Sequence, residues 1–116
     1  MKPLSPQNTS HPSNRLTLEC TVDGGQVQLK LVGEVDLETV PFLDQELLRI
    51  TAAEPERLLL DLSGVEFIDS TGLSAIVRAE QSAVTGGLEL SLRGGSRQVR
   101  RLFELTGLLE RLNFEE

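Results

Sequence analysis

Apolar and polar residues alternate along two stretches near the start of the chain, and this pattern predicts a β-hairpin. Strict alternation is typical of a strand with one buried face and one wetter face. Asp23-Gly24-Gly25 separates the two stretches, and its glycines supply the positive φ that a tight turn requires. The apolar positions are Leu16, Leu18, Cys20 and Val22 in the first stretch and Val27, Leu29 and Leu31 in the second.

Three helices are predicted where apolar residues recur at spacings of three and four. The first begins near Thr39, because Pro41 fits only within a first helical turn. The second is closed by Gly86-Gly87 and the third stops at Gly107, in keeping with glycine at helix ends. The predicted helices cover about residues 39–50, residues 70–84 and the stretch between Ser96 and Gly107.

The remaining apolar runs predict further strands and an α/β fold. Residues 57–64, RLLLDLSG, form a continuous apolar run, as in a strand that is covered on both faces. Leu88, Leu90 and Leu92 alternate as another strand, and residues 108–114 fit either a short helix or a last strand. Strands separated by helices indicate a mixed sheet of four to five strands with parallel crossovers. The amphipathic hairpin places the helices mainly on one face.

Composition narrows the class of partner. Residues 1–14 hold three prolines among polar residues and predict a disordered tail, which leaves residues 15–116 as one domain. A net charge of -7 repels nucleic-acid backbones, and 3% aromatic residues offer little base stacking. No window approaches the roughly 18 apolar residues of a membrane span, and the N-terminus lacks a secretory signal. We therefore expect a cytoplasmic protein that binds neither nucleic acid nor membrane.

The chain lacks the residues that several common kinds of site require. Cys20 and His11 are the only residues of their types, so a disulfide, a His-based metal site and a Ser-His-acid triad are not expected. No phosphate-binding glycine loop with its lysine is present, so no nucleotide cofactor is expected. Asp61 ends an apolar strand like the phospho-accepting aspartate of receiver domains. The only lysines are Lys2 and Lys30, however, and that site needs a lysine on a later strand.

Residues 61–73, DLSGVEFIDSTGL, join an apolar strand to a helix through an acid and two hydroxyls. A lone Asp-Ser in this place is an ordinary helix cap. The longer string is more specific, and it resembles the anti-sigma factor antagonists of the STAS domain family. Gly33-Glu34-Val35-Asp36 resembles the loop after the second strand of that family. Residues 101–108, RLFELTGL, resemble its C-terminal helix, so the resemblance covers roughly residues 15 to 112.

The resemblance implies a switchable binding protein and not an enzyme. Its partner is an anti-sigma factor serine kinase, which supplies ATP and Mg²⁺ itself. The unphosphorylated antagonist binds this kinase and frees the sigma factor, phosphorylation releases the antagonist, and a serine phosphatase resets it. By position the phosphoacceptor is Ser70. The partner-binding residues that the resemblance implies are Asp36, Asp69, Ser70, Thr71 and Gly72.

Physical chemistry supports a phosphate at this position and leaves the roles of its neighbours open. A hydroxyl at a helix N-terminus lies among free N–H groups, and the helix dipole there favours an added phosphate. Gly72 is expected to keep the loop uncrowded for an approaching kinase. Asp36 and Asp69 either bond the loop amides or orient the Ser70 hydroxyl.

Two other functions fit the same pattern. One is a STAS module of a membrane transport or lipid-trafficking complex, which has the same fold but does not require the serine. The other is a small hydrolase that uses Ser70, and this alternative lacks a credible general base.

Overall fold

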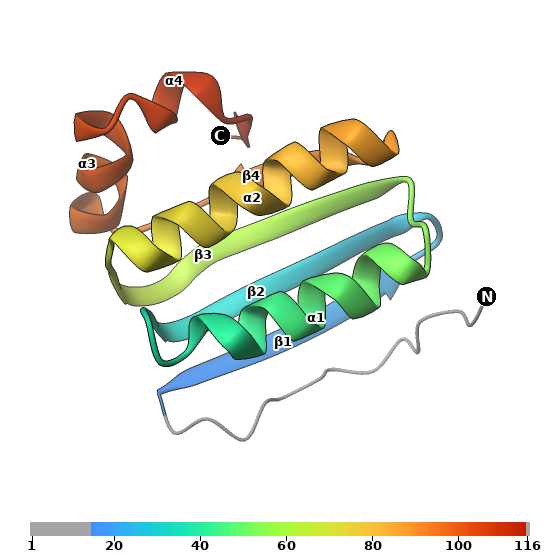
Figure 1. Ribbon diagram of the computed structural model, residues 1–116, viewed down its shortest axis with the longest axis horizontal. Helices are drawn as coiled ribbons and strands as arrows, with labels where there is room; N and C mark the ends of the chain where they lie inside the picture. The colour runs from blue at the N-terminus through green and yellow to red at the C-terminus, as the bar shows by residue number, and fades with distance from the viewer. Residues whose placement is uncertain (1–14, 116) are drawn as a thin grey trace.

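The computed structural model describes residues 15–115 and contains one five-stranded mixed sheet (Figure 1). The predicted α/β fold with an N-terminal hairpin is confirmed. The predictions for the tail and for His11 fall outside the described residues. The strands, which neighbour one another in chain order, are β1 (Leu16–Asp23), β2 (Gln26–Val35), β3 (Arg57–Ile68), β4 (Glu89–Arg93) and β5 (Phe114–Glu115).

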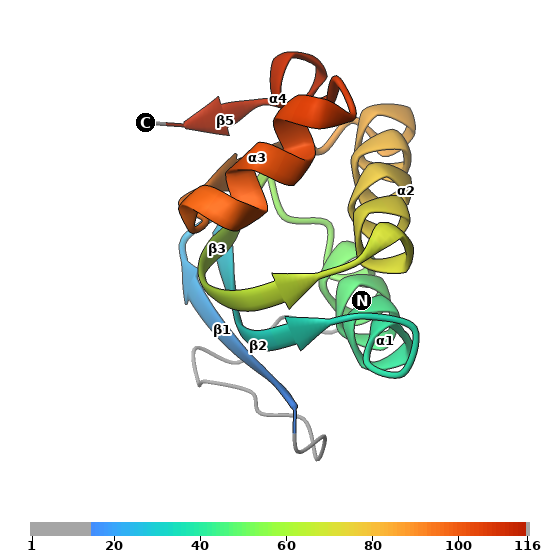
Figure 2. The ribbon, with the colours of Figure 1, turned by 90° about the vertical axis from the view of Figure 1, so that its left-hand side faces the viewer.

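Two long helices lie side by side across one face of the sheet, as the hairpin pattern predicted. Two shorter helices lie at the end of the molecule where the second long helix begins (Figures 1 and 2). Residues 108–114, which fitted either element, supply both a short helix and the start of the last strand. The helices are α1 (Val40–Ala52), α2 (Ser70–Gly86), α3 (Arg97–Leu105) and α4 (Leu108–Arg111).

The hairpin turn needs only one of its two glycines in the left-handed region. Strand β1 pairs antiparallel with β2 from Leu16↔Gly33 to Asp23↔Gln26, so the turn has two residues. Gly24 has a φ of 64°, where an L side chain is strained, whereas Gly25 is not among the residues with positive φ. All other strand pairs are parallel.

Strands β2 and β3 run further than the sequence pattern predicted. Strand β3 continues past residue 64 to Ile68, and Gly33, Glu34 and Val35 belong to β2 and not to the loop. The register between β2 and β3 shifts twice, and such bulges interrupt the alternation from which strands are read. The extra length pairs Val35 with Ile68 and brings the ends of both strands to one edge.

The core lies between the sheet and helices α1 and α2 and is built of aliphatic side chains. The alternating positions of the hairpin, Cys20 included, are buried, apart from Val22, which is partly buried, and this confirms their predicted orientation. Phe103 on α3 is fully buried and packs edge-to-face on Phe114, with 5.2 Å between the ring centroids. Through this contact the end of the chain holds α3 against the sheet.

One row across all five strands alternates in charge. Register pairs join Glu19 to Lys30, Lys30 to Asp61, Asp61 to Arg93 and Arg93 to Glu115. Opposite charges on adjacent strands stabilise a sheet. Asp61 is buried, and although burial alone raises its pKa, hydrogen bonds from Ser63 and Arg93 lower the pKa below its usual value. Asp61 is thus a structural carboxylate.

Candidate functional site

Two loops meet at the edge of the sheet where β2 and β3 end. Val35 and Ile68 are register partners, and the Asp69 amide donates to the Val35 carbonyl over 3.2 Å. Asp36 and Asp69 directly follow this pair, so parallel pairing brings the two sequence motifs together. Helix α2 begins here with Ser70 as its first residue.

Asp69 caps helix α2 and leaves Ser70 at the surface. Its carboxylate accepts from the Gly72 amide at 3.0 Å, and its carbonyl accepts from the Leu73 amide. The amides of Ser70 and Thr71 are the remaining first-turn donors, and no group within residues 15–115 accepts from them. Ser70 is exposed, and its hydroxyl makes no hydrogen bond to any described residue.

Asp36 is held by groups of its own chain. The Arg15 guanidinium reaches both carboxylate oxygens, with N–O distances of 2.5 and 3.1 Å. The amides of Glu38 and Thr39 donate to Oδ1 at 3.0 and 3.1 Å. The Arg15 hydrogen bonds and these amides hold the pKa of Asp36 below its usual value. Asp36 therefore accepts amides of the β2–α1 loop and Asp69 accepts an amide of the first turn of α2, and neither bonds the Ser70 hydroxyl.

Sequence reasoning missed Arg15 and Thr39. The Thr39 side chain is buried, and its hydroxyl donates to the Glu34 carbonyl at 2.8 Å and accepts from the Asp36 amide at 2.9 Å. A lone arginine before a strand and a threonine before a helix are too common to signal such roles. Together they fix the loop between β2 and α1 in one shape.

Gly72 has a different role from the one predicted. It is buried, and a Cβ at this position would lie 2.5 Å from the Val35 carbonyl oxygen and 2.7 Å from Ile68 Cγ1. Gly72 thus allows α2 to pack against the end of β2. A requirement for glycine thus arises inside the domain.

Apolar side chains surround the Ser70 end of the molecule. Leu37, Phe67 and Leu105 are exposed by 73%, 50% and 68%, and they come from the β2–α1 loop, the end of β3 and the end of α3. A hollow of about 240 Å³ lies between the end of β3 and α3 and includes Phe67 and Leu105 in its lining. Exposed apolar groups gathered at one end are typical of a surface that binds a protein.

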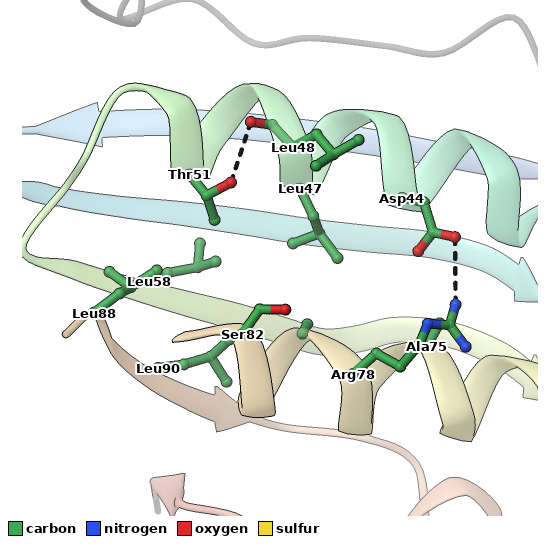
Figure 3. Close-up of a pocket in the computed structure, with 11 residues that line it drawn as sticks. Asp44, Leu47, Leu48, Thr51, Leu58, Ala75, Arg78, Ser82, Leu88 and Leu90 are labelled. Atoms are coloured by element: carbon green, nitrogen blue, oxygen red, sulfur yellow. Dashed lines mark hydrogen bonds and ion pairs between the residues drawn. The ribbon is translucent and has the colours of Figure 1, made fainter. Parts of the chain in front are cut away.

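A separate groove runs between α1 and α2 (Figure 3). It encloses about 310 Å³ and is lined mainly by leucines and alanines. Arg78 and Asp44 bridge the two helices across it at 3.3 Å, and Ser82 lies further along α2 (Figure 3). Ser70 is not part of its lining.

Two other kinds of feature are absent from the described residues. Within residues 15–115, no group of three or more His, Cys, Asp or Glu side chains is arranged to hold a metal ion. None of the helices in this range has the length and apolar character to cross a membrane. The sheet edge at Ser70, where the two loops and the exposed apolar side chains meet, is the candidate site.

Comparison with known proteins shows the family to which this chain belongs. The family model described as the STAS domain matches residues 17–116. The chain belongs to the STAS domain family. Within it, the chain is 32% identical over 101 residues to a protein of Staphylococcus aureus named anti-sigma-B factor antagonist. That match covers 87% of this chain and 94% of the relative.

Solved STAS structures agree with the fold. An anti-sigma factor antagonist from Mycobacterium paratuberculosis is 27% identical, with a TM-score of 0.77 and coverage of 91% of this chain and 89% of that one. SpoIIAA, a Bacillus cell fate determinant solved in its phosphorylated form, has a TM-score of 0.66 at 20% identity, over 87% of this chain and 91% of that one. The latter likeness shows the fold alone.

Proposed function

We propose that this STAS domain is an anti-sigma factor antagonist that is switched by phosphorylation of Ser70. The observation that carries the proposal is the placement of Ser70. It is exposed at the start of α2, directly after the capping residue Asp69, and next to two first-turn amides that have no acceptor among the described residues. The S. aureus relative, which is matched over most of both chains, bears the name of such an antagonist.

A phosphate on Ser70 acts on the contact surface and leaves the fold in place. The helix dipole and the amides of Ser70 and Thr71 favour negative charge by about 0.3–1 kcal/mol. Repulsion from Asp69 offsets part of this, and salt screens both effects. At a protein contact, however, the same dianion must lose its water, which costs several kcal/mol unless a cation faces it.

The partner is an anti-sigma factor with serine kinase activity, and ATP and Mg²⁺ belong to that partner. A serine phosphatase restores the binding form. Asp36, Asp69 and Gly72 contribute indirectly by fixing the shape of the chain around Ser70. Thr71 contributes its first-turn amide beside Ser70. The exposed Leu37, Phe67 and Leu105 supply apolar contact area around it. We propose that this exchange of partners takes place in the cytoplasm.

The test is to purify the anti-sigma factor kinases of the source organism and to measure their binding to the wild type, Ser70→Ala and Ser70→Asp by calorimetry. We expect one kinase to bind the wild type and Ser70→Ala, and to bind Ser70→Asp at least about a hundredfold more weakly, the factor that ~3 kcal/mol represents. Ser96→Asp is the control, because it places the same charge at the N-terminus of α3.

Melting temperatures complete this test. Ser70→Asp should melt within about 4 °C of the wild type, so that its loss of binding does not reflect unfolding. Normal binding by folded Ser70→Asp, or binding of no kinase by the wild type, would disprove the proposal.

A further inference from the structure

A hollow of about 380 Å³ opens directly beside Ser70, between helix α2 and the turn that joins α3 to α4. It is distinct from the α1–α2 groove of Figure 3, with which it shares only Arg78. The proposed switch at Ser70 does not by itself identify the group that occupies this hollow. Its lining residues are Ser70, Leu73, Ser74, Val77, Arg78, Thr106 and Leu108.

The lining is apolar in its body and positive at one point. Leu73, Val77 and Leu108 supply apolar surface, and the lining contains one cation and no acid. Arg78 is half-exposed, and Asp44 is its only ion-pair partner within residues 15–115, at 3.3 Å on the side of α1. A guanidinium has five N–H donors, so most donors of Arg78 remain available to a further acceptor.

We infer that this hollow receives an apolar side chain of the anti-sigma factor, aromatic or branched aliphatic, followed by an acidic residue that binds Arg78. The inference rests on the proposed function and specifies its contact. Protein interfaces concentrate their binding energy in apolar anchors that fill such pockets. The spare donors of Arg78 in the lining favour an acidic neighbour for the anchor. The net charge of -7 makes two copies of this chain repel one another, which disfavours a second copy as the occupant.

This contact explains why phosphorylation of Ser70 ends binding. Ser70 is part of the lining, so an anchor in the hollow excludes water from around the Ser70 hydroxyl. A neutral hydroxyl tolerates the loss of water better than a phosphate dianion does, because removing water from a charged group costs much more free energy. The anchor and the hydrated phosphate therefore exclude one another.

Two exposed serines on α2 allow a matched test. Ser74 lies in the hollow, whereas Ser82 lies in the α1–α2 groove. A tryptophan at position 74 therefore fills the hollow, and a tryptophan at position 82 leaves it open. The probe is the kinase that binds the wild type in the calorimetric test above. We expect Ser74→Trp to bind it at least about tenfold more weakly, in line with the loss of an anchor contact, and Ser82→Trp to bind it within about twofold of the wild type.

The charge is tested separately with Arg78→Ala and Asp44→Asn. Both remove the ion pair between α1 and α2, but only Arg78→Ala removes the cation from the hollow. We expect Arg78→Ala to weaken binding about fivefold or more, because it removes the cation that faces the acidic residue. We expect Asp44→Asn to leave binding unchanged or tighter, because it frees the guanidinium for that residue. Circular dichroism checks that all four variants are folded.

The outcomes separate this inference from the proposed function. If the wild type binds a kinase and Ser74→Trp binds it equally well, or if Asp44→Asn weakens binding as much as Arg78→Ala, the hollow is not the anchor site and the phospho-switch still stands. If sedimentation shows a dimer of the wild type that Ser74→Trp dissociates, the occupant is a second copy and the inference is wrong. If no kinase binds the wild type, both proposals fail.

Discussion

Arg15 and Asp36 form a two-point ion pair that ties the residue before β1 to the loop after β2. The two nitrogen–oxygen distances are 2.5 and 3.1 Å, and the Asp36 side chain is only 14% exposed. Asp36 also accepts the amides of Glu38 and Thr39, so one carboxylate closes the loop that leads into α1. The start of the described chain thus shapes the edge at which Ser70 lies.

Replacement of Asp36 should weaken the fold through this loop. We predict that Asp36→Ala lowers the free energy of unfolding by about 1–2 kcal/mol, as expected for loss of a carboxylate that satisfies two backbone amides. Denaturation in urea measures the change. Asp44→Ala is the control, because its more exposed pair with Arg78 should contribute about 0–1 kcal/mol. Equal effects of the two changes would contradict the role assigned to Asp36.

The stability of the domain should depend on acid pH through the same group. The pKa of Asp36 is lowered in the folded state, chiefly by the Arg15 hydrogen bonds, so the unfolded chain takes up the proton first. The contribution is complete above the usual aspartate pKa of about 3.9 and disappears as the pH falls through the lowered value of the folded state. Asp36→Asn keeps an acceptor for the amides but has no charge to titrate.

We therefore predict that the wild type exceeds Asp36→Asn in free energy of unfolding at pH 6 and that this difference shrinks below about pH 4. Urea denaturation at a series of pH values provides the measurement. A difference that stays constant from pH 6 to pH 2.5 would show that the charge of Asp36 does not contribute.

The two ends of α2 offer a matched pair of glycines. We predict that Gly72→Ala costs about 1–3 kcal/mol of stability, because the new Cβ would meet the Val35 carbonyl oxygen at 2.5 Å. Gly86→Ala should instead add up to about 1 kcal/mol, because nothing lies within 4 Å of its Cβ and alanine favours the helix. Thermal and urea denaturation report both. A tolerated Gly72→Ala would mean that α2 does not pack as closely on β2 as described.

Ser70 should be the only efficient phosphoacceptor. It is exposed at the first position of α2, whereas Thr71 is partly buried and Ser63 lies within β3 and not at the start of a helix. We predict that the partner kinase with ATP modifies the wild type and not Ser70→Ala, as read by mass spectrometry of phosphopeptides. Phosphate found predominantly on Thr71 or Ser63 would overturn this assignment.

The sequence by itself determined most of the segments that form the sheet and the helices, although it left residues 108–114 open. Alternation in 16–22 and 27–31 reflects a two-residue strand period, and spacings of three and four reflect the helical turn, so these local patterns do not depend on the rest of the chain. The same holds for the cap at Asp69, because the capping carboxylate and its target amide lie only three residues apart. Ser70 could therefore be placed at a helix N-terminus from the sequence.

Only the tertiary structure decided how distant segments meet. Arg15 and Asp36 are 21 residues apart, and Gly72 in α2 must be glycine because of Val35, which lies at the end of β2. The lengths of β2 and β3 depend on bulges in their pairing, and the hollow beside Ser70 forms only where α2 meets the α3–α4 turn. Contacts of this kind arise from packing between elements, and a pattern within one segment carries no record of its partner in space.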